Sequence, residues 1–315
     1  MLVVATELGI ADLLADGPQS AESLAATTGT HPRSLYRLLR TLASHGVFSE
    51  RDDSRFELTP LAELLRVDSP GSMRATVLAE GSDFYPVWAE LMHSVTTGET
   101  AFERVYGASN WEYRKHHPEA NARFNAYMGD LMQQKLRVLL AHYHFPESGT
   151  IIDVGGNNGT LLSAILARYP AMRGVVFDQP HVVGSALPVI AAAGVSDRCT
   201  VERGDFFVAV PTGGDIYLLS HVLHDWGDED AAAILQRCRE AMTAGARLLI
   251  IERVMPAGNE PSVAKLRDIA MLLSNKGGQE RTEPEWRALL DAGGFDLASV
   301  SPIGPAHHVL EGTPR

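Results

Sequence analysis

The chain of 315 residues carries 39 acidic side chains against 27 Lys and Arg, so its formal net charge at pH 7 is −12. Hydrophobic residues make up 45% and charged residues 21%, the balance of a globular protein with a sizeable core rather than of a disordered chain. The negative charge disfavours nucleic acid as the main partner, because a surface that binds nucleic acid needs an excess of basic side chains.

Cysteine content and apolar runs indicate the compartment. Cys199 and Cys238 are too few for a disulfide framework, and we expect both as reduced thiols. No run approaches 18 apolar residues, so we expect no membrane span and no membrane partner. The apolar start, Met1–Ala5, lacks basic residues and is followed by Glu7, unlike a signal peptide. We therefore expect a cytoplasmic protein.

Residues 1–66 have the pattern of a winged helix. We expect helices over 5–14, 21–27 and 33–45, followed by a hairpin over 47–58. A DNA-binding regulator is one hypothesis, with a recognition helix that presents Arg33, Arg37 and Arg40. The six Arg of this segment face nine Asp plus Glu, a net charge of −3, which favours a dimerisation module instead.

Residues 67–148 read as helices joined by loops. A long helix is expected from Arg123 to Leu140, with apolar side chains at helical spacing. Packing in the core explains most of these side chains. The pair His142 and His144 lacks a third ligand nearby in sequence, which disfavours a metal site there.

The stretch from Ile151 to Gly159 predicts a strand, a glycine turn and a helix, the first half of a βαβ nucleotide-binding unit. The strand ends in Asp153, and the helix ends near Tyr169. The turn contains three glycines, which let a ligand lie against bare backbone: Gly155, Gly156 and Gly159. Many α/β proteins carry such a turn for packing alone, so this motif by itself is weak.

Acidic groups then recur at the ends of the strands that follow. The second expected strand ends in Asp178, which suits a ribose diol. The third, over 200–207, ends in Asp205 and Phe206, which suit an adenine ring. The fourth, over 215–219, runs into Ser220, and the fifth, over 247–252, ends in Glu252. A doubly wound α/β sheet binds ligands at these carboxyl ends.

These motifs, with His224-Asp225-Trp226 and the loop 277–282, resemble in order the S-adenosylmethionine-dependent O-methyltransferases that carry a winged-helix dimerisation domain. That family includes plant caffeic-acid-type enzymes and bacterial enzymes that modify aromatic antibiotics. The resemblance implies a mostly α winged-helix dimerisation domain (1–66), a helical linking region (67–148) that contributes to the dimer and to the substrate pocket, and a Rossmann-like methyltransferase domain (149–315). It also implies a homodimer, although relatives usually begin with one more helix that reaches the partner subunit, so the strength of the dimer stays open.

The resemblance assigns roles to particular residues. S-adenosylmethionine would be held by the three glycines and by Asp153, Asp178, Asp205, Phe206 and Ser220, and S-adenosylhomocysteine would be the product. The aromatic acceptor would meet Phe124, Met128, Asp225, Met271 and Asn275. Plant relatives often carry a lysine where this chain has Ser220. Their glycine turn also differs at Asn157 and Asn158.

The chemistry points to a base. A phenol of pKa about 10 is mostly protonated at pH 7, and histidine titrates near that pH, so His224 is the expected general base. Glu252 or Glu280 would accept a hydrogen bond from its ring. A metal held by His221 and His224 is disfavoured, because the family needs none there.

Alternatives to base-assisted O-methylation follow from the same residues. An N- or C-methyltransferase acting on a related aromatic is the nearest enzyme. The DNA-binding regulator and a protein that binds the cofactor without turnover are the alternatives outside catalysis. The sequence specifies neither the acceptor nor its ring position.

Overall fold

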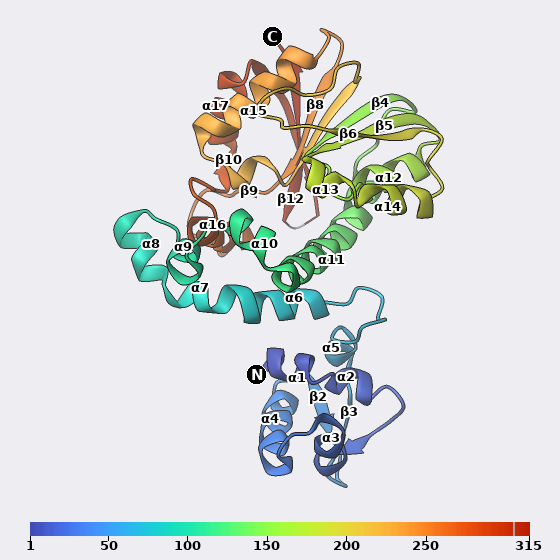
Figure 1. Cartoon of the computed structure of the whole chain (residues 1–315), viewed down its shortest axis with the longest axis vertical. Coiled ribbons are helices and arrows are strands. Elements are labelled where there is room, and N and C mark those ends of the chain that lie inside the picture. The colour runs from blue at the N-terminus through green and yellow to red at the C-terminus, as the bar shows by residue number, and fades with distance from the viewer. Residues whose placement is uncertain (305) are drawn as a thin grey trace. The chain divides into compact units, whose positions relative to one another are not determined.

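The computed structural model describes residues 1–304 and 306–315, with the side chains of 133, 134 and 181 left out. By its internal contacts the chain divides into two compact units (Figure 1). The first comprises residues 1–89 and 111–134, and the second comprises residues 90–110 and 135–315. The domain boundaries expected after residues 66 and 148 stay predictions.

The N-terminal part of the first unit contains the expected helices and hairpin. Its helices are α1 (Leu2–Glu7), α2 (Ile10–Leu13), α3 (Ala21–Thr28), α4 (Pro32–Ser44) and α5 (Pro60–Glu63). Its small sheet has the order β1 (Gln19–Ser20), β3 (Arg55–Leu58), β2 (Phe48–Glu50). The single helix predicted over 5–14 is wrong: Gly9 adopts φ 65° and separates α1 from α2.

Local sequence explains where these helices begin. The Ser20 hydroxyl accepts from the Ser23 amide at the start of α3, and Pro32 occupies the first turn of α4, where its missing N–H is harmless. Buried Leu39 packs with Phe48 and Phe56 in one core. The winged-helix pattern of the sequence is therefore confirmed as a packed structure.

The rest of the first unit is helical. It contains α6 (Arg74–Ala79), the π-helical turn η1 (Glu80–Phe84), α7 (Tyr85–Ala89) and most of α10 (Asn110–His116). The long helix α11 (Pro118–His142) starts in this unit and ends in the second. Arg123 on α11 ion-pairs with Asp83 of η1 at 2.6 Å.

The second unit is built on a seven-stranded sheet. Its order is β11 (Phe295–Ile303), β12 (His307–Pro314), β8 (Arg247–Glu252), β7 (Ile216–Ser220), β4 (Ser148–Val154), β5 (Ala171–Asp178), β6 (Cys199–Arg203). Strands β6, β5, β4, β7 and β8 pair in parallel, and β12 is antiparallel to β8 and to β11. Figure 1 shows helices on both faces of this sheet, which confirms the doubly wound fold.

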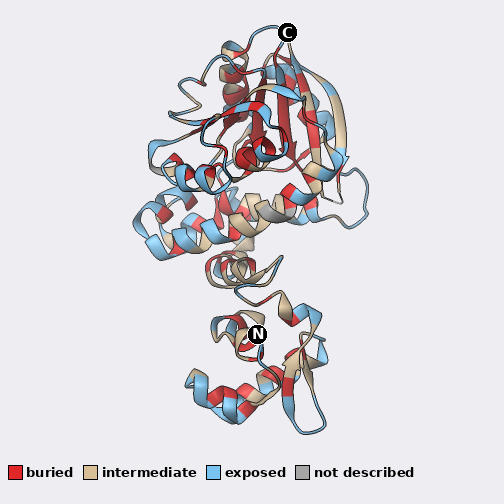
Figure 2. Ribbon diagram, turned by 90° about the vertical axis from the view of Figure 1, so that its right-hand side faces the viewer, coloured by how far each residue is buried: buried red, intermediate tan, exposed pale blue. Residues whose placement is uncertain are grey.

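The helices on one face are α12 (Thr160–Arg168), α13 (Pro180–Val183) and α14 (Ala186–Ala192), and those on the other are α15 (Asp228–Ala241) and α17 (Glu283–Ala292). The unit also contains α8 (Leu91–Thr97), α9 (Ala101–Tyr106), α16 (Val263–Ser274) and the short parallel pair β9 (Val254–Met255) and β10 (Arg281–Thr282). Trp286 of α17 is fully buried against the sheet, and the central strands are buried along their length (Figure 2).

The third strand ends earlier than the sequence predicted. Strand β6 stops at Arg203, and Asp205 turns the chain by accepting from the amide of Phe207 at 2.9 Å. This is a typical local hydrogen bond of Asp that competes with strand pairing. Asp205 and Phe206 therefore lie just beyond the strand rather than in it.

The order of the sheet determines where a ligand can bind. The chain winds in opposite directions from β4 and from β7, which are parallel neighbours with Asp153 opposite Leu218. Open α/β sheets hold ligands at the carboxyl ends of strands beside such a switch point. Asp153 and Ser220 lie at the carboxyl ends of β4 and β7, so we expect a ligand site beside these two strand ends.

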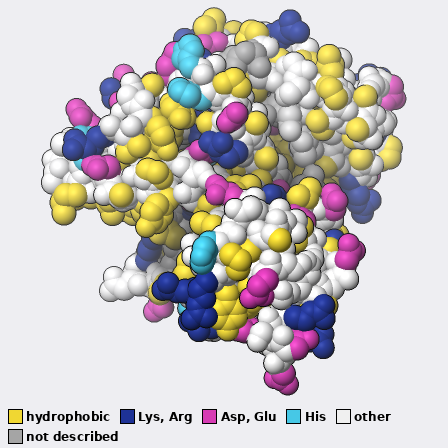
Figure 3. All heavy atoms as spheres, turned by 60° about the horizontal axis from the view of Figure 1, so that its bottom comes forward, with side chains coloured by type: hydrophobic (Ala, Val, Ile, Leu, Met, Phe, Trp, Pro, Cys, Tyr) yellow, Lys and Arg dark blue, Asp and Glu magenta, His cyan; other side chains and the backbone are white. Residues whose placement is uncertain are grey.

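On the face shown in Figure 3, Lys and Arg side chains form only small patches, and Asp and Glu side chains are scattered over the same face. Both cysteines are buried and free. Among the described residues, no helix is long and apolar enough to cross a membrane.

Candidate active site

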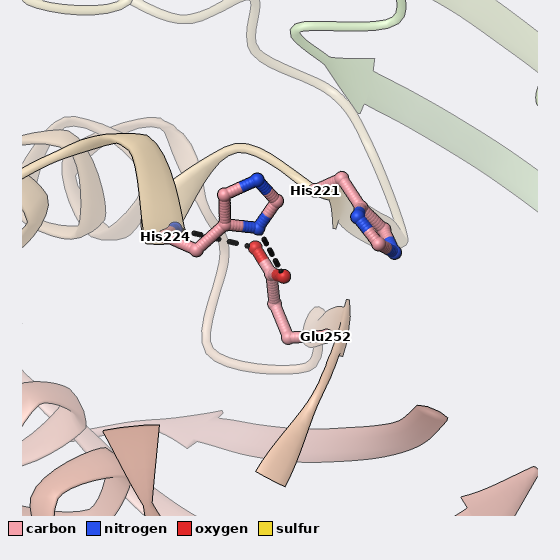
Figure 4. A group of neighbouring side chains, drawn as sticks. All are labelled: His221, His224 and Glu252. Carbon is pink, nitrogen blue, oxygen red and sulfur yellow. Dashed lines mark hydrogen bonds and ion pairs between the residues drawn. The ribbon is translucent and has the colours of Figure 1, made fainter. Parts of the chain in front are cut away.

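A buried histidine and carboxylate form the centre of the site (Figure 4). His224 lies on the 3₁₀ turn η2 (Leu223–Asp225) directly after β7, and Glu252 ends the neighbouring strand β8. His224 Nδ1 donates to Glu252 Oε2 at 2.7 Å. The other oxygen, Oε1, accepts from the backbone amides of Val222 at 3.1 Å and His224 at 3.4 Å. One carboxylate thus holds both the ring and the turn that carries it, and leaves Nε2 of the ring free to accept a proton.

The charges around His224 make its ring a strong base. Burial by itself would lower its pKa, but the negative charges of Glu252 and Asp225 outweigh burial and raise the pKa to about 9. Burial raises the pKa of Glu252, yet the imidazolium and its hydrogen bond lower it overall, so this carboxyl is held ionised. The two groups therefore stabilise each other as an ion pair.

The loop after α16 fixes the turn of His224 from its other side. Arg281 is buried, and its Nη1 and Nη2 donate to the carbonyls of Leu223 at 3.0 Å and Trp226 at 2.9 Å. Its Nε donates to Asp228 at 2.9 Å. The backbone amide of Gln279 adds a bond of 2.9 Å to the carbonyl of His224. The planar guanidinium thus bridges the two ends of the turn, which a lysine could not do.

Glu280, the second predicted orienter, is placed differently from Glu252. Its Oε1 accepts from Arg253 Nη1 at 3.0 Å, and its Oε2 is buried without a hydrogen-bond partner in the described structure. Burial raises the pKa of Glu280, and its negative charge in turn raises the pKa of His224. Glu280 therefore influences the imidazole through its charge, while Glu252 makes the contact. Its role in catalysis stays a prediction.

Three residues predicted to contact the acceptor lie together beside His224. Asn275 Nδ2 donates to Asp225 Oδ1 at 2.6 Å and contacts the sulfur of Met271 at 3.7 Å. Asp225 Oδ1 lies 3.5 Å from His224 Nε2. Asn110 Nδ2 donates to Asn275 Oδ1 at 3.1 Å, a partner that the sequence did not indicate. The other two predicted acceptor contacts, Phe124 and Met128, belong to the part of α11 in the first unit, where the Arg114 guanidinium covers the Phe124 ring at 3.6 Å.

The glycine turn forms a cradle at the end of β4. Gly155 adopts φ 74°, and a Cβ there would approach Val222 Cγ2 to 2.8 Å, so only glycine fits. Gly156 and Gly155 both donate to the Phe177 carbonyl, and Gly159 begins α12. Asp153 is buried, and its Oδ2 has no hydrogen-bond partner in the described structure. Burial and the charge of Asp178 raise the pKa of Asp153 to about 7. A buried orphan carboxylate beside bare backbone fits a polar, partly cationic ligand.

The remaining predicted cofactor contacts follow along the same edge. Asp178 Oδ2 accepts from the Asn157 amide at 2.9 Å, and its Oδ1 accepts from the Gln179 amide at 2.6 Å. Asp205 is exposed, and half-buried Phe206 packs edge-on against Trp226 with ring centroids 6.0 Å apart. The structure therefore brings Asp178 onto the glycine turn, and it leaves the ring of Phe206 partly open.

Ser220 has a partner that sequence reasoning missed. Lys135 of α11 is buried, and its Nζ donates to Ser220 Oγ at 2.8 Å. The signal in the sequence was a lysine within the apolar stripe of a long helix, between Met132 and Leu136. His221, the next residue, adopts φ 56°, and its buried Nε2 has no hydrogen-bond partner among the described residues.

Three side chains at the same carboxyl ends of the strands also have ligand atoms close enough together to bind a metal ion. The ligand atoms of His221, His224 and Glu252 lie within 4.8 Å of one another. Burial lowers the pKa of His221 well below its ordinary value, so this ring is neutral and able to coordinate. The Nδ1 of His224, however, already bonds Glu252, and coordination through Nε2 would take away the atom that a base requires.

The fold and this edge define a class, the Rossmann-like methyltransferases that use S-adenosylmethionine. The seven-stranded order with one antiparallel strand near the edge, the glycine cradle and the acidic strand ends together carry this assignment.

The comparisons extend the assignment to the whole chain. Residues 88–296 match the O-methyltransferase domain family, and residues 1–68 match the O-methyltransferase dimerisation domain. The chain is 47% identical to the phenazine O-methyltransferase PhzM of Lysobacter antibioticus, over 99% of this chain and 92% of that protein. It is 37% identical to the 8-amino-8-demethylriboflavin N,N-dimethyltransferase of Streptomyces davaonensis, over 99% of this chain and 90% of that one.

A solved structure is similar throughout. The O-methyltransferase NcsB1 from neocarzinostatin biosynthesis, in complex with S-adenosylmethionine and 2-hydroxy-5-methyl naphthoic acid, superimposes with a TM-score of 0.86 at 34% identity. The match covers 100% of this chain and 95% of that one. The chain belongs to the O-methyltransferase family, whose members take their methyl group from S-adenosylmethionine.

Replacing Arg281 tests how the turn of His224 is held. Arg281→Met should lower the free energy of unfolding by about 1–3 kcal/mol, because the carbonyls of Leu223 and Trp226 lose their donors in a buried place. The exposed side of the Asp228 ion pair adds little. Chemical denaturation gives the free energy, with Arg287→Met, an exposed arginine paired with Glu283, as the control. Equal stability of the two variants would contradict this role of Arg281.

Proposed function

We propose that this protein methylates a hydroxyl group of an aromatic small molecule, with His224 as the general base. The observation that carries the proposal is the buried bond of 2.7 Å from His224 Nδ1 to Glu252, which fixes the ring and leaves Nε2 to take the proton of the acceptor. The relatives whose names specify an aromatic acceptor, such as a phenazine or a naphthoate, support the class of substrate.

The base is matched to its task. When bound, S-adenosylmethionine supplies a methyl group already activated by a positive sulfur. What the chain must add is removal of the hydroxyl proton and alignment of the acceptor. A ring whose pKa is about 9 accepts a proton from a phenol of pKa about 10 at a cost of only about 1.4 kcal/mol, the free energy of one pKa unit. The raised pKa also has a disadvantage, because at pH 7 only roughly one molecule in a hundred carries the neutral ring before ligands bind.

The other roles in the proposal follow from position along the sheet edge. Gly155, Gly156 and Gly159 would let the cofactor approach the backbone, with Asp178 taking the ribose and Asp205 with Phe206 taking the adenine ring. Asp225, Met271 and Asn275 would border the acceptor next to His224. Phe124 and Met128 keep their predicted part in contacting the acceptor. Glu280 would strengthen the base through its charge.

N-methylation is the second candidate, because a relative of 37% identity acts on an amino group. An aromatic amine attacks through a neutral lone pair and loses its proton afterwards, so it depends less on a base. Assays with a matched phenol and aniline of one ring system separate the two. The proposal requires that the phenol be methylated faster and that only this reaction collapse in His224→Gln.

We also infer a homodimer formed through the N-terminal domain. The matched dimerisation domain supports it, and so do the large apolar side chains that this domain exposes, Val4 of α1 and Leu61 of α5 among them.

His224→Gln should reduce kcat by about 10²-fold or more and leave the affinity for S-adenosylhomocysteine unchanged, because the ring acts on the acceptor and not on the cofactor. The deficit should shrink as the pH approaches the pKa of the acceptor, since the acceptor then ionises without help. Turnover assays from pH 6 to 10 and calorimetry measure both quantities. Near wild-type turnover at pH 7 would sink the base assignment.

The pH profile of wild type gives a second test. The rising limb of kcat/KM should reflect His224, whose pKa is raised to about 9, so activity falls as pH drops below that value and protonates the base. Glu252→Gln removes the charge that raises this pKa, so the limb should move to lower pH while the maximum rate declines. A limb that stays in place would assign it to another group.

The dimer is tested with matched charge substitutions. Light scattering at micromolar concentration should give twice the chain mass of 34.1 kDa. Val4→Glu combined with Leu61→Glu should shift the mass toward the monomer, because charges would be buried in the interface. Leu187→Glu, an equally exposed apolar position on α14, is the control and should stay dimeric. A monomeric wild type would refute the inference.

A further inference from the structure

Three polar side chains connect the start of α10 to His224. Asn110, the first residue of α10, donates through Nδ2 to Asn275 Oδ1 at 3.1 Å. Asn275 in turn donates through its Nδ2 to Asp225 Oδ1 at 2.6 Å. The same oxygen of Asp225 lies 3.5 Å from His224 Nε2. Both asparagines are buried, so water competes little for the bonds between these groups.

The donors and acceptors of these bonds all run in one direction. A carboxylate can only accept, so Asn275 turns its amide nitrogen toward Asp225 and its amide oxygen toward Asn110. The same nitrogen of Asn275 also contacts Met271 Sδ at 3.7 Å. Hydrogen bonds aligned in this way polarise one another, so the bond from Asn110 strengthens the bond that Asn275 makes to Asp225.

The backbone of Asn275 is fixed, which leaves the orientation of its amide group to be determined. Its N–H donates to the Met271 carbonyl at 2.9 Å, and its carbonyl accepts from the Gly278 amide at 2.9 Å. A Cβ at Gly278 would approach Asn275 Cβ to 2.9 Å, so the loop packs tightly against this residue. The bond from Asn110 then selects one orientation of the amide, the one that presents a donor to Asp225.

Asp225 can compete with the acceptor for the nitrogen that acts as the base. Its Oδ1 lies 3.5 Å from His224 Nε2, beyond the length of about 2.7–3.2 Å of a well-formed N–H···O bond. A carboxylate that closed this gap would bond the protonated ring where the acceptor hydroxyl has to bind. It would also favour the charged ring, which cannot take up a proton. Asn275 opposes this movement by holding the same oxygen.

We propose that Asn110 is a positioning residue for catalysis, which acts through Asn275 to restrain the Asp225 carboxylate and so keeps Nε2 of His224 open to the acceptor hydroxyl. The inference rests on the function proposed above, in which Nε2 takes the proton of that hydroxyl as the oxygen receives the methyl group. Asn110 acts on the ring through two other side chains, so its effect should appear in the behaviour of His224.

The other charges around His224 are held by separate contacts. Glu252 of β8 and Glu280, from the loop before β10, raise its pKa as Asp225 does, and both make hydrogen bonds outside the two asparagines. The ring of His221, whose centroid is 5.1 Å away, is kept neutral by burial. A change at either asparagine should therefore reach the base through Asp225.

An NMR titration of protein with ¹⁵N-labelled histidine tests the proposal without an acceptor. Asn275→Ala removes a donor from Asp225 and should raise the pKa of His224 by roughly one unit, a tenfold smaller share of neutral ring at pH 7. Asn110→Leu, which replaces the amide by an apolar group of similar shape, should raise the pKa by a smaller amount. In the Asn275→Ala background Asn110→Leu should add nothing, because its effect passes through Asn275.

A matched control and a second variant complete the experiment. Asn259→Leu, at an exposed asparagine in the loop after β9, should titrate as wild type does. Asn110→Ser repeats the titration if the Leu variant folds poorly. An unchanged pKa in the single variants at Asn110 would contradict the proposal. An equal shift with and without Asn275 would contradict it too, because Asn110 would then act through general packing.

Turnover of the phenol from the assay pair above separates this inference from the proposed function. In Asn110→Leu, kcat/KM at pH 7 should fall by the same factor as the share of neutral ring, and it should recover toward the wild-type value as the pH rises. Wild-type turnover in His224→Gln would overturn the base itself. A collapse in His224→Gln together with an unshifted profile in Asn110→Leu would remove only the role of Asn110.

Discussion

The bond between His224 and Glu252 is the interaction on which the site depends. Glu252 ends a central strand and is fully buried, so its charge requires donors close by. It finds them in the imidazole and in two amides of the turn after β7, and the same three bonds give that turn its shape. A buried carboxylate that holds both ring and turn explains why the base is rigid and why its pKa is raised. Arg281 and the amide of Gln279 complete the arrangement by fixing the carbonyl side of the turn.

Buried charged groups lie in two regions along the carboxyl ends of the parallel strands. At the acceptor end Glu252 and Glu280 are matched by His224 and Arg253, and the nearby rings of His221 and His307 are kept neutral by burial. At the β4–β7 end Lys135 donates to Ser220, and Asp153 Oδ2 has no hydrogen-bond partner among the described residues. Each region contains a buried carboxylate oxygen without a hydrogen-bond partner among the described residues, Glu280 Oε2 in the first and Asp153 Oδ2 in the second. Each of these oxygens is therefore able to accept a hydrogen bond from a bound ligand.

The sequence predicted those structural elements whose position is determined by residues that are neighbours in the chain. Short apolar runs that end in Asp153, Asp178 and Glu252 identified the parallel strands, because buried strands need such runs and ligand-facing ends need polar groups. The predicted boundaries of helices and strands were wrong where one residue adopts a conformation that the surrounding pattern does not indicate. Gly9 separates α1 from α2, and Asp205 turns the chain before the predicted end of the third strand. The sequence left Glu252 and Glu280 as equal candidates for the bond to His224, because only distances in three dimensions separate them. Lys135 was missed since its partner lies on another element, far along the chain.

The most direct test of the account is an NMR titration of the protein with ¹⁵N-labelled histidine, which reports the tautomer and the pKa of His224 itself. The account predicts that the neutral ring carries its proton on Nδ1, toward Glu252, and that the ring titrates near 9, well above its ordinary value of 6.5. A neutral ring protonated on Nε2, or a pKa at or below 6.5, would show that Glu252 does not hold His224 as a base and would contradict the account.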